Sequence, residues 1–249
     1  MPRFVLYNIE YGEGFTGHWY NYLAFWKTLQ SSNTQDLTKF LKQLHPDILG
    51  IIEIDAGSMR THHHSMIEHF KKSLKLKHVT AKEKYKPHSL ISSLPIFKKQ
   101  FNALLTHYPS SNPDYLYLKN GVKRLVIKST INTPTPITVF LVHLSLTKHS
   151  REHQIEELEK MLEETKPPMI VAGDFNTFYA PGELFGLMKH LNLKKADDDG
   201  KTFPSFNPKK ALDHILVSKE IKVKKISIPR IQLSDHRPVI MDFEVQKKS

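Results

Sequence analysis

The stretch 168–177 contains the strongest candidates for catalytic or metal-binding residues. A short apolar run, 169–172, has the composition of a buried strand and stops at Gly173. Asp174 and Asn176 follow, and because side chains alternate along an extended chain, residues two apart point the same way. A carboxylate can accept a proton or hold a hard cation, and an amide can orient a water molecule or a phosphate oxygen. The pattern indicates a polar site at the strand end, although a strand that ends in an Asx-type turn has the same residues.

Three other apolar runs each bring one polar or titratable residue to a similar position. The run near the start of the chain ends in Asn8, which is either a turn former or a polar group delivered to a site. The run 48–54 contains Glu53, a carboxylate that is costly to bury unless a metal or a basic group compensates its charge. The run 137–144 contains His143. This repetition favours a shared polar site.

Two pairs of acid and histidine follow in the last part of the chain. Asp213 and His214 lie in a strand-like run. Asp235 and His236 stand side by side just before the final strand-like run. A histidine held by a carboxylate stays charged more easily near neutral pH, which suits it to contact a phosphate group or to donate a proton.

The composition restricts the metals and partners that this chain could use. Its 249 residues include no cysteine, which excludes disulfides and thiolate metal sites. The remaining oxygen and imidazole ligands favour Mg²⁺, with Mn²⁺ and Ca²⁺ as alternatives. The net charge of +11 favours an anionic partner such as nucleic acid, a phosphorylated metabolite or a lipid headgroup. A basic surface without a dedicated partner would give the same charge.

The length and patterning predict one domain over residues 1–249. The chain is long enough for a sizeable core, and it contains no repeat, low-complexity tract or linker. No apolar run approaches the roughly 20 residues of a membrane span, and the N-terminus lacks the apolar region and cleavage site of a signal peptide. We therefore expect a cytoplasmic monomer without a transmembrane segment.

Apolar periodicity predicts the elements that must position these residues. Amphipathic spacing indicates helices over 36–45, 66–76, 151–164 and 181–192, and Ser150 is the expected N-cap of the third. Further strands are expected over 89–91, 103–106, 124–129 and 223–228. The lysine-rich stretch 77–87 is expected to be exposed. An aromatic-rich loop at 15–26 either packs on the domain or stacks on a base or a lipid-facing rim.

Six motifs in this order resemble those of the endonuclease/exonuclease/phosphatase superfamily, the DNase I-like metal hydrolases. They span nearly the whole chain: YN at 7–8, IIEID at 51–55, VHLSL at 142–146, GDFNT at 173–177, LDHILVS at 212–218 and SDHRPV at 234–239. The resemblance implies an α+β fold, a four-layer α/β/β/α sandwich of two mostly antiparallel sheets flanked by helices. Periodicity alone does not distinguish this fold from other layered α/β folds.

The resemblance also implies a metal site. Glu53 corresponds to the principal Mg²⁺ ligand, assisted by Asn8, and Asp235 lies near the metal as a further ligand or a supporting group. Hard carboxylate and amide oxygens suit Mg²⁺, which keeps several waters and takes phosphate oxygens as additional ligands. Ile52 precedes Glu53 where the family often has glutamine, a departure that leaves the ligand itself in place.

The remaining site residues are implied to act on the substrate. Asp174 activates or positions the attacking water, and Asn176 orients it and contacts the phosphoryl group. His236, oriented by Asp213, stabilises the developing charge on a phosphate oxygen. His143 contacts the phosphate or acts on the leaving group. Phosphate ester hydrolysis depends on charge neutralisation and an in-line water more than on covalent chemistry, and this set of residues is compatible with that need.

Three functions are compatible with these residues. The first is a Mg²⁺-dependent phosphodiesterase or nuclease that acts on an anionic phosphate ester, with nucleic acid as one candidate substrate. The second is a phosphomonoesterase or a sphingomyelinase-like lipid phosphodiesterase with the same catalytic residues. The third is a non-catalytic phosphate-binding module. The sequence favours the first, because the expected acids, amides and histidines are all present and the chain is strongly basic.

Overall fold

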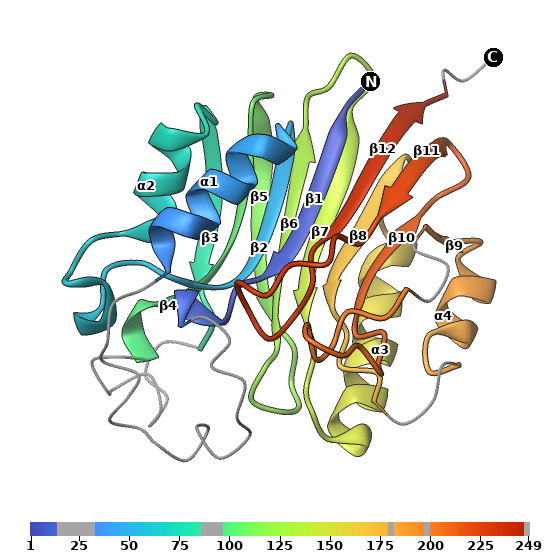
Figure 1. The fold of residues 1–249 in the computed structure, drawn as a ribbon. Helices are drawn as coiled ribbons and strands as arrows, with labels where there is room; N and C mark the ends of the chain where they lie inside the picture. Colours follow the sequence, from blue (N-terminus) through green and yellow to red (C-terminus); the bar gives the residue numbers. More distant parts are fainter. Residues whose placement is uncertain (14–32, 86–96, 179–181, 197–199, 247–249) are drawn as a thin grey trace.

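The structure is a computed structural model that describes residues 1–13, 33–85, 97–178, 182–196 and 200–246 (Figure 1). The aromatic-rich loop predicted at 15–26 and the strand predicted at 89–91 lie outside the described residues. The described residues form two six-stranded sheets that face each other, with helices packed on the outer side of each sheet.

The first sheet has the strand order β11-β12-β1-β2-β4-β3. Strands β1 and β2 pair in parallel, and the other neighbours in this sheet pair antiparallel. The sheet combines strands from both ends of the chain: β1 (Arg3–Asn8), β2 (Ile48–Asp55), β3 (His78–Glu83), β4 (Gln100–Thr106), β11 (Ile221–Ser227) and β12 (Val239–Val245).

The second sheet has the strand order β5-β6-β7-β8-β10-β9. Strands β7 and β8 pair in parallel, and the other neighbours pair antiparallel. The central part of the chain supplies all its strands: β5 (Ser110–Tyr117), β6 (Leu125–Ile131), β7 (Ile137–His143), β8 (Met169–Asp174), β9 (Lys194–Lys195) and β10 (Asp213–Val217). Both sheets are thus mostly antiparallel, as predicted.

Three apolar layers hold the sheets and helices together. The central layer lies between the two sheets and includes Leu6, Leu104, Ile127 and Leu141, all 0–1% exposed. A second layer joins the first sheet to α1 (Thr34–Leu44) and α2 (Met66–Ser73). A third joins the second sheet to α3 (Lys148–Glu163) and α4 (Phe185–His190). Burying a large aliphatic side chain contributes about 1.5–3 kcal/mol, so these layers are the main source of stability. The predicted four-layer sandwich is confirmed.

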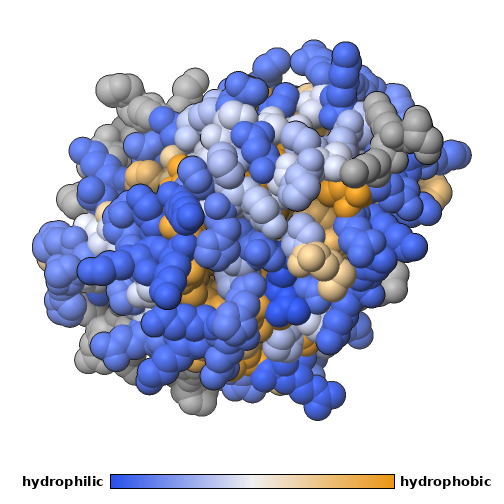
Figure 2. Space-filling view, turned by 90° about the horizontal axis from the view of Figure 1, so that it is seen from above, coloured by the Kyte–Doolittle hydropathy of each residue, from blue (hydrophilic) through white to orange (hydrophobic). Residues whose placement is uncertain are grey.

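The end of the molecule seen from above in Figure 2 is mostly hydrophilic, and its hydrophobic residues form small separate areas. Within the described ranges, no helix is both long and apolar enough to cross a bilayer. Large apolar side chains of the described residues are accordingly concentrated in the three internal layers.

Two of the four edge strands, β3 and β5, differ from the sequence predictions. The polar stretch expected to be exposed contains β3, and the apolar patterns do not predict β5 at all. Each lies at the edge of its sheet and presents mainly half-buried or exposed side chains, so neither carries a clear apolar alternation. Short apolar periodicity is therefore a reliable signal for the central strands and a weak one for these edges.

The helix boundaries also differ by a few residues. Helix α3 begins at Lys148 with Thr147 as its N-cap residue, three positions before the predicted Ser150. Helix α2 ends at Ser73, because Lys75 adopts a positive φ of 57° that does not continue a helix. Helix α4 covers only Phe185–His190 of the predicted 181–192.

The strand pairing sets which residues meet at one edge of each sheet. In the parallel pair β7–β8, His143 is the register partner of Asp174, and in the antiparallel pair β8–β10 the partner of Asp174 is Asp213. In the parallel pair β1–β2, Asn8 is the partner of Ile52, next to Glu53. Residues that are far apart in the sequence therefore lie side by side at adjacent strand ends.

Gly173 allows an unusually close approach of β8 to β7. A Cβ atom added to Gly173 would lie 2.0 Å from the carbonyl oxygen of Val142, well inside any normal contact. We expect Gly173→Ala to destabilise the fold by more than about 4 kcal/mol, because the backbone of a central strand would have to move. Gly186→Ala is the matched control: nothing lies within 4 Å, and alanine in helix α4 should stabilise by about 0.5–1 kcal/mol. Equal unfolding midpoints for both variants in urea would show that β8 can accept a side chain at position 173.

Arg3 and Asp242 join the first and last strands of the chain. The Arg3 guanidinium donates to both carboxylate oxygens of Asp242, at 2.6 and 2.9 Å, and this hydrogen bonding lowers the pKa of Asp242. Since the folded-state pKa is depressed, the contribution is present above the unfolded pKa of about 4 and is lost as the pH falls through the folded value.

We expect Asp242→Asn to lower the free energy of unfolding by about 1 kcal/mol at pH 7, in line with a partly exposed pair. The difference from the parent should shrink below about pH 4. Asp36→Asn is the control, because Asp36 forms only an exposed pair with Lys39 and should change stability by less than about 0.5 kcal/mol. A difference that stays constant down to pH 2 in denaturant titrations would exclude the ionic contribution.

Candidate active site

The structure brings all eight residues singled out in the sequence into one buried cluster at the ends of β1, β2, β7, β8 and β10. Direct contacts link most of them. Each is at most 9% exposed: Asn8, Glu53, His143, Asp174, Asn176, Asp213, Asp235 and His236. Such a concentration of buried polar groups is rare in a protein interior unless they serve one another or a ligand.

Asp174 lies at the centre of this cluster. Its Oδ2 accepts a hydrogen bond from Asn8 Nδ2 at 3.1 Å, and it lies 3.4 Å from His143 Nε2 and 3.9 Å from His236 Nε2. Burial is the largest influence on this carboxyl and raises its pKa to about 6, although the charge of His236 acts in the opposite direction. Asn8 from the first sheet thus meets Asp174 from the second, which ties the two sheets together at the site.

Asp213 holds His236 in place. The distance from His236 Nδ1 to Asp213 Oδ2 is 2.6 Å, and because a carboxylate only accepts, the ring nitrogen is the donor. Burial is the largest influence on His236 and lowers its pKa, but the neighbouring carboxylates of Asp213 and Asp235 outweigh it and leave the pKa well above the usual value. The site therefore favours the protonated imidazolium, whose Nε2 lies 3.9 Å from Asp174 Oδ2.

The surroundings of His143 lower its pKa, whereas those of His236 raise it. It is fully buried, and neither of its ring nitrogens has a hydrogen-bond partner among the described residues. Burial, followed by the charges of Lys123 and Lys84, lowers its pKa well below the usual value. A neutral imidazole results, with Nε2 3.9 Å from Glu53 Oε1 as well as near Asp174. Buried nitrogens of this kind can bind a ligand or a water that joins the site.

Glu53 sits at an irregularity of β2. The register with β4 shifts between Ile51 and Ile54, Glu53 has a positive φ of 58°, and its backbone N–H donates to Asn102 Oδ1 at 3.1 Å. This bulge turns the Glu53 side chain out of the regular alternation of the strand. Burial alone would raise the pKa of Glu53, but the charges of Lys84 and Lys123 outweigh it, and the pKa is well below the usual value.

Asn176 reaches the cluster in a way that the alternation rule did not predict. The chain turns directly after Asp174: the backbone N–H of Asn176 donates to Asp174 Oδ1 at 3.0 Å, and Asn176 has a positive φ of 52°. The Asn176 amide donates to the carbonyl oxygen of Leu144 at 2.8 Å. The alternative interpretation, a strand that ends in an Asx-type turn, is therefore correct for the backbone.

Three charged residues of the site were missed in the sequence. Lys84, in the stretch expected to be exposed, is only 3% exposed, and its Nζ lies 2.5 Å from Glu53 Oε1. Lys123 Nζ lies 3.4 Å from the same oxygen. Glu10 lies two residues after Asn8, and burial and the charges of Asp235 and neighbouring acids raise its pKa to about 9. The two-residue spacing from Asn8 could have indicated Glu10, whereas no pattern in the sequence indicated the two lysines.

The donor set is suited to a hard divalent cation. Asn8, Glu10, Glu53 and Asp235 offer amide and carboxylate oxygens, which Mg²⁺, Mn²⁺ and Ca²⁺ prefer. Burial is the largest cause of the raised pKa of Glu10 and of Asp235, and the charges of neighbouring acids, including that of Glu53, add to it. The residues present therefore fit a metal of this type.

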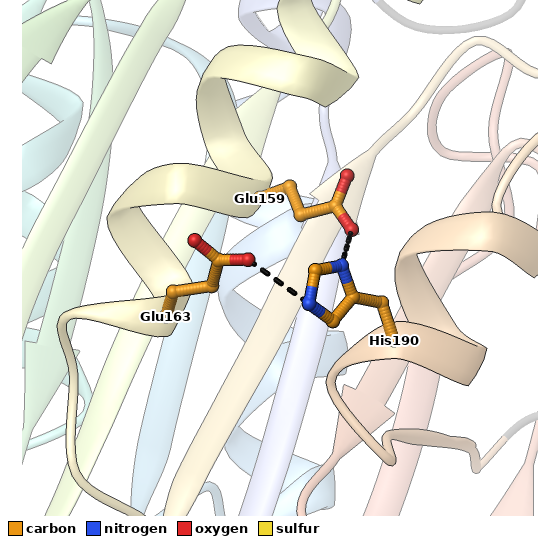
Figure 3. Close-up of side chains that lie close together, drawn as sticks. All are labelled: Glu159, Glu163 and His190. Atoms are coloured by element: carbon orange, nitrogen blue, oxygen red, sulfur yellow. Dashed lines mark ion pairs between the residues drawn. The ribbon is translucent and has the colours of Figure 1, made fainter.

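A second group of acids and histidine lies elsewhere, between α3 and α4. Glu159 Oε1 lies 2.6 Å from His190 Nδ1, and Glu163 Oε1 lies 3.1 Å from His190 Nε2. Figure 3 shows the two carboxylates at different nitrogens of one ring, so they hold it from two sides instead of converging with it on a single point. This cluster joins two helices at the surface and lacks the depth of the site around Asp174.

The two-sheet sandwich thus carries a buried cluster of acids, amides and imidazoles at its strand ends. The sequence profile of the Endonuclease/Exonuclease/phosphatase family matches residues 5–236, and the chain belongs to this family. The resemblance based on the six motifs is confirmed.

The similar proteins support this assignment at different levels. A "UPF0294 protein" of Vibrio campbellii is 29% identical over 144 residues, which cover 55% of this chain and 49% of that protein. The match thus spans about half the length of this curated relative. A conserved protein of unknown function from Enterococcus faecalis V583 has a TM-score of 0.74 and 14% identity, with 98% of this chain and 100% of that chain covered. A mannosyl-6-phosphatase of Bacteroides thetaiotaomicron has a TM-score of 0.70 and 15% identity, with the same coverage. At these identities the structural matches establish the fold.

Asn102 holds the bulge that presents Glu53. We expect Asn102→Ala to weaken Mg²⁺ binding about 10-fold, because the backbone of Glu53 loses its only side-chain acceptor among the described contacts and the carboxylate is no longer fixed. Isothermal titration with Mg²⁺ would measure the change. Ser129→Ala, an equally buried polar position in the other sheet, should leave Mg²⁺ affinity unchanged. Parental affinity in Asn102→Ala would show that the bulge does not position a metal ligand.

Proposed function

We propose that this protein is a Mg²⁺-dependent phosphodiesterase of the nuclease type that uses an activated water as the nucleophile. The observation that carries the proposal is the position of Asp174, whose Oδ2 is within 3.9 Å of both His143 Nε2 and His236 Nε2. An acceptor for a water proton thus lies beside one imidazole held as a cation and one kept neutral. This combination suits the attack of water on a phosphate ester.

Asn8, Glu53 and Asp235 would hold the Mg²⁺, with Glu10 as an additional carboxylate. When bound, the ion would neutralise charge on the phosphate oxygens and lower the cost of bringing an anionic substrate to an acidic site. The hard oxygen atoms of these residues support this assignment, and so do the charges of Glu53 and Asp235, which both act on Glu10.

Each remaining residue has a defined task in this proposal. Asp174 orients the water and accepts its proton, and Asn176 keeps the Asp174 carboxylate in place through its backbone N–H. His236, fixed by Asp213, donates a hydrogen bond to a phosphate oxygen as negative charge develops. His143 offers its ring nitrogen to the phosphate or to the leaving oxygen.

The charge of the chain supports a diester within a polyanion as substrate. A surplus of 11 positive charges attracts nucleic acid and raises the rate of encounter. A phosphomonoester is the second candidate, because Lys84 and Lys123 bring two ammonium groups to the site and would favour a dianionic phosphate. The mannosyl-6-phosphatase of similar fold is compatible with this alternative.

A substrate panel would distinguish these functions. We expect Mg²⁺-dependent cleavage of plasmid DNA, RNA or bis(p-nitrophenyl) phosphate, and slower turnover of p-nitrophenyl phosphate. Activity on the monoester alone would favour the phosphatase. Inactivity on all of them, together with unaltered binding of phosphate, would favour a non-catalytic phosphate-binding module.

The metal requirement leads to a prediction for Glu53. Hydrolysis should stop in EDTA and return with added Mg²⁺, and Glu53→Gln should raise the Mg²⁺ concentration for half-maximal rate by about 10-fold or more, because glutamine keeps the shape but loses the charge. Glu159→Gln is the matched control, since it changes an acid of the surface cluster in Figure 3. It should leave the Mg²⁺ dependence unchanged. If Glu53→Gln and Glu159→Gln gave the same Mg²⁺ curve as the parent, Glu53 would not be a metal ligand.

A further inference from the structure

Two lysines converge on a single carboxylate oxygen of the site. Lys84 Nζ lies 2.5 Å and Lys123 Nζ 3.4 Å from Glu53 Oε1. One ammonium group would be enough to compensate the charge of Glu53, and a second costs repulsion as well as desolvation. Lys123 also interacts electrostatically with Asp174 and Asp235, so it is placed among the acids of the site and is not only a counter-ion of Glu53.

Lys84 is built into the site. It directly follows β3, and its backbone N–H donates to the Gln100 carbonyl at 2.8 Å. Its ammonium group also donates to the hydroxyl of Tyr11 and lies 5.1 Å from the centre of the Tyr11 ring. Lys84 is 3% exposed, so it is a buried residue and not a surface lysine.

Lys123 is fixed through its backbone. It lies in the turn between β5 and β6, where the fully buried Gln154 of α3 donates to the carbonyl oxygens of Asn120 and Lys123 at 2.6 and 2.8 Å. The Oε1 of Gln154 accepts from the backbone N–H of Ser145 at 2.7 Å, two residues after His143. Gly121 has a φ of 81°, and a Cβ there would lie 2.7 Å from the Ser145 hydroxyl oxygen. The turn is thus locked against the strand that carries His143.

We propose that Lys84 and Lys123 are phosphate-binding residues that move from Glu53 to the phosphoryl group of the substrate when a divalent cation binds Glu53. This inference rests on the proposed function. A divalent ion and two ammonium groups around one oxygen would repel one another strongly, since two unit charges 4 Å apart interact by about 4 kcal/mol even at an effective dielectric constant of 20. The phosphate oxygens provide the negative charge that the displaced ammonium groups need.

The consequence is that metal and phosphate bind cooperatively. Phosphate alone would have to compete with Glu53 for the lysines, and the metal alone would have to displace the lysines without a new partner for them. Each ligand therefore removes an obstacle to the other. Because such coupling is reciprocal, Mg²⁺ must raise phosphate affinity by the same factor by which phosphate raises Mg²⁺ affinity.

Isothermal titration with inorganic phosphate, with and without saturating Mg²⁺, would test this. For the parent we expect Mg²⁺ to tighten phosphate binding at least about 10-fold, with the same factor in the reverse titration. Lys84→Met and Lys123→Met should each weaken phosphate binding in Mg²⁺ about 10-fold. In the absence of phosphate, Lys84→Met should bind Mg²⁺ as tightly as the parent or more tightly, because a competing cation is gone.

Lys82→Met and Lys119→Met are the matched controls. Lys82 lies on β3 two residues before Lys84 and pairs with Glu83, and Lys119 is an exposed residue near the turn of Lys123. Both should retain the parental phosphate affinity and coupling. Lys123 is 21% exposed, so Lys123→Met provides the test even if Lys84→Met does not fold.

Parental phosphate affinity in Lys123→Met, or absence of coupling in the parent, would overturn the proposal and leave the lysines as counter-ions of Glu53. These outcomes are separate from the substrate panel, because binding is measured without turnover. Coupled binding of phosphate and Mg²⁺ without hydrolysis of any ester would reject the proposed function and retain the role of the two lysines.

Discussion

The whole site depends on burying several carboxylates at the meeting point of two sheets without leaving their charges uncompensated. An isolated buried carboxylate is so costly that it would be protonated or the fold would open. Here three of the acids have a partner from a different part of the chain. Glu53 faces Lys84 and Lys123, Asp213 faces His236, and the Asn8 amide reaches Asp174 from the opposite sheet. The site is therefore complete only when the two sheets are packed against each other.

The backbone is strained at two of the positions from which these side chains reach the site. Glu53 and Asn176 both adopt positive φ values, a conformation that costs of order 1–3 kcal/mol for residues other than glycine. Close to them, β7 and β8 approach so tightly at Gly173 that no side chain fits. Regular strands on either side, buried in the three apolar layers, supply the stability that holds these strained positions. Two of the positive-φ positions of the chain thus belong to candidate site residues.

The sequence predicted the central strands well, and it indicated eight polar residues that the structure places together, for two different reasons. Strands such as β2 and β8 are buried on both faces, so they read as continuous apolar runs with abrupt ends. The site residues stand in motifs whose order could be compared with a known family. Lys84 and Lys123 could not be found in this way, because an edge strand and a turn rich in lysine look the same whether the ammonium group meets solvent or a buried acid. Their proximity to Glu53 can be recognised only in the folded structure.

The charge balance of the cluster connects these features with a divalent ion. Five carboxyl groups, those of Glu10, Glu53, Asp174, Asp213 and Asp235, face three cationic groups, those of Lys84, Lys123 and His236. Glu53 and Asp213 have the shortest ion pairs of the cluster, and the pKa values of Glu10, Asp174 and Asp235 are raised. Burial is the largest cause of each raised pKa, and neighbouring carboxylates add to it. A divalent cation among these oxygens would supply positive charge where burial and like charges now favour protonation, so the electrostatics that raise these pKa values would also favour a bound metal.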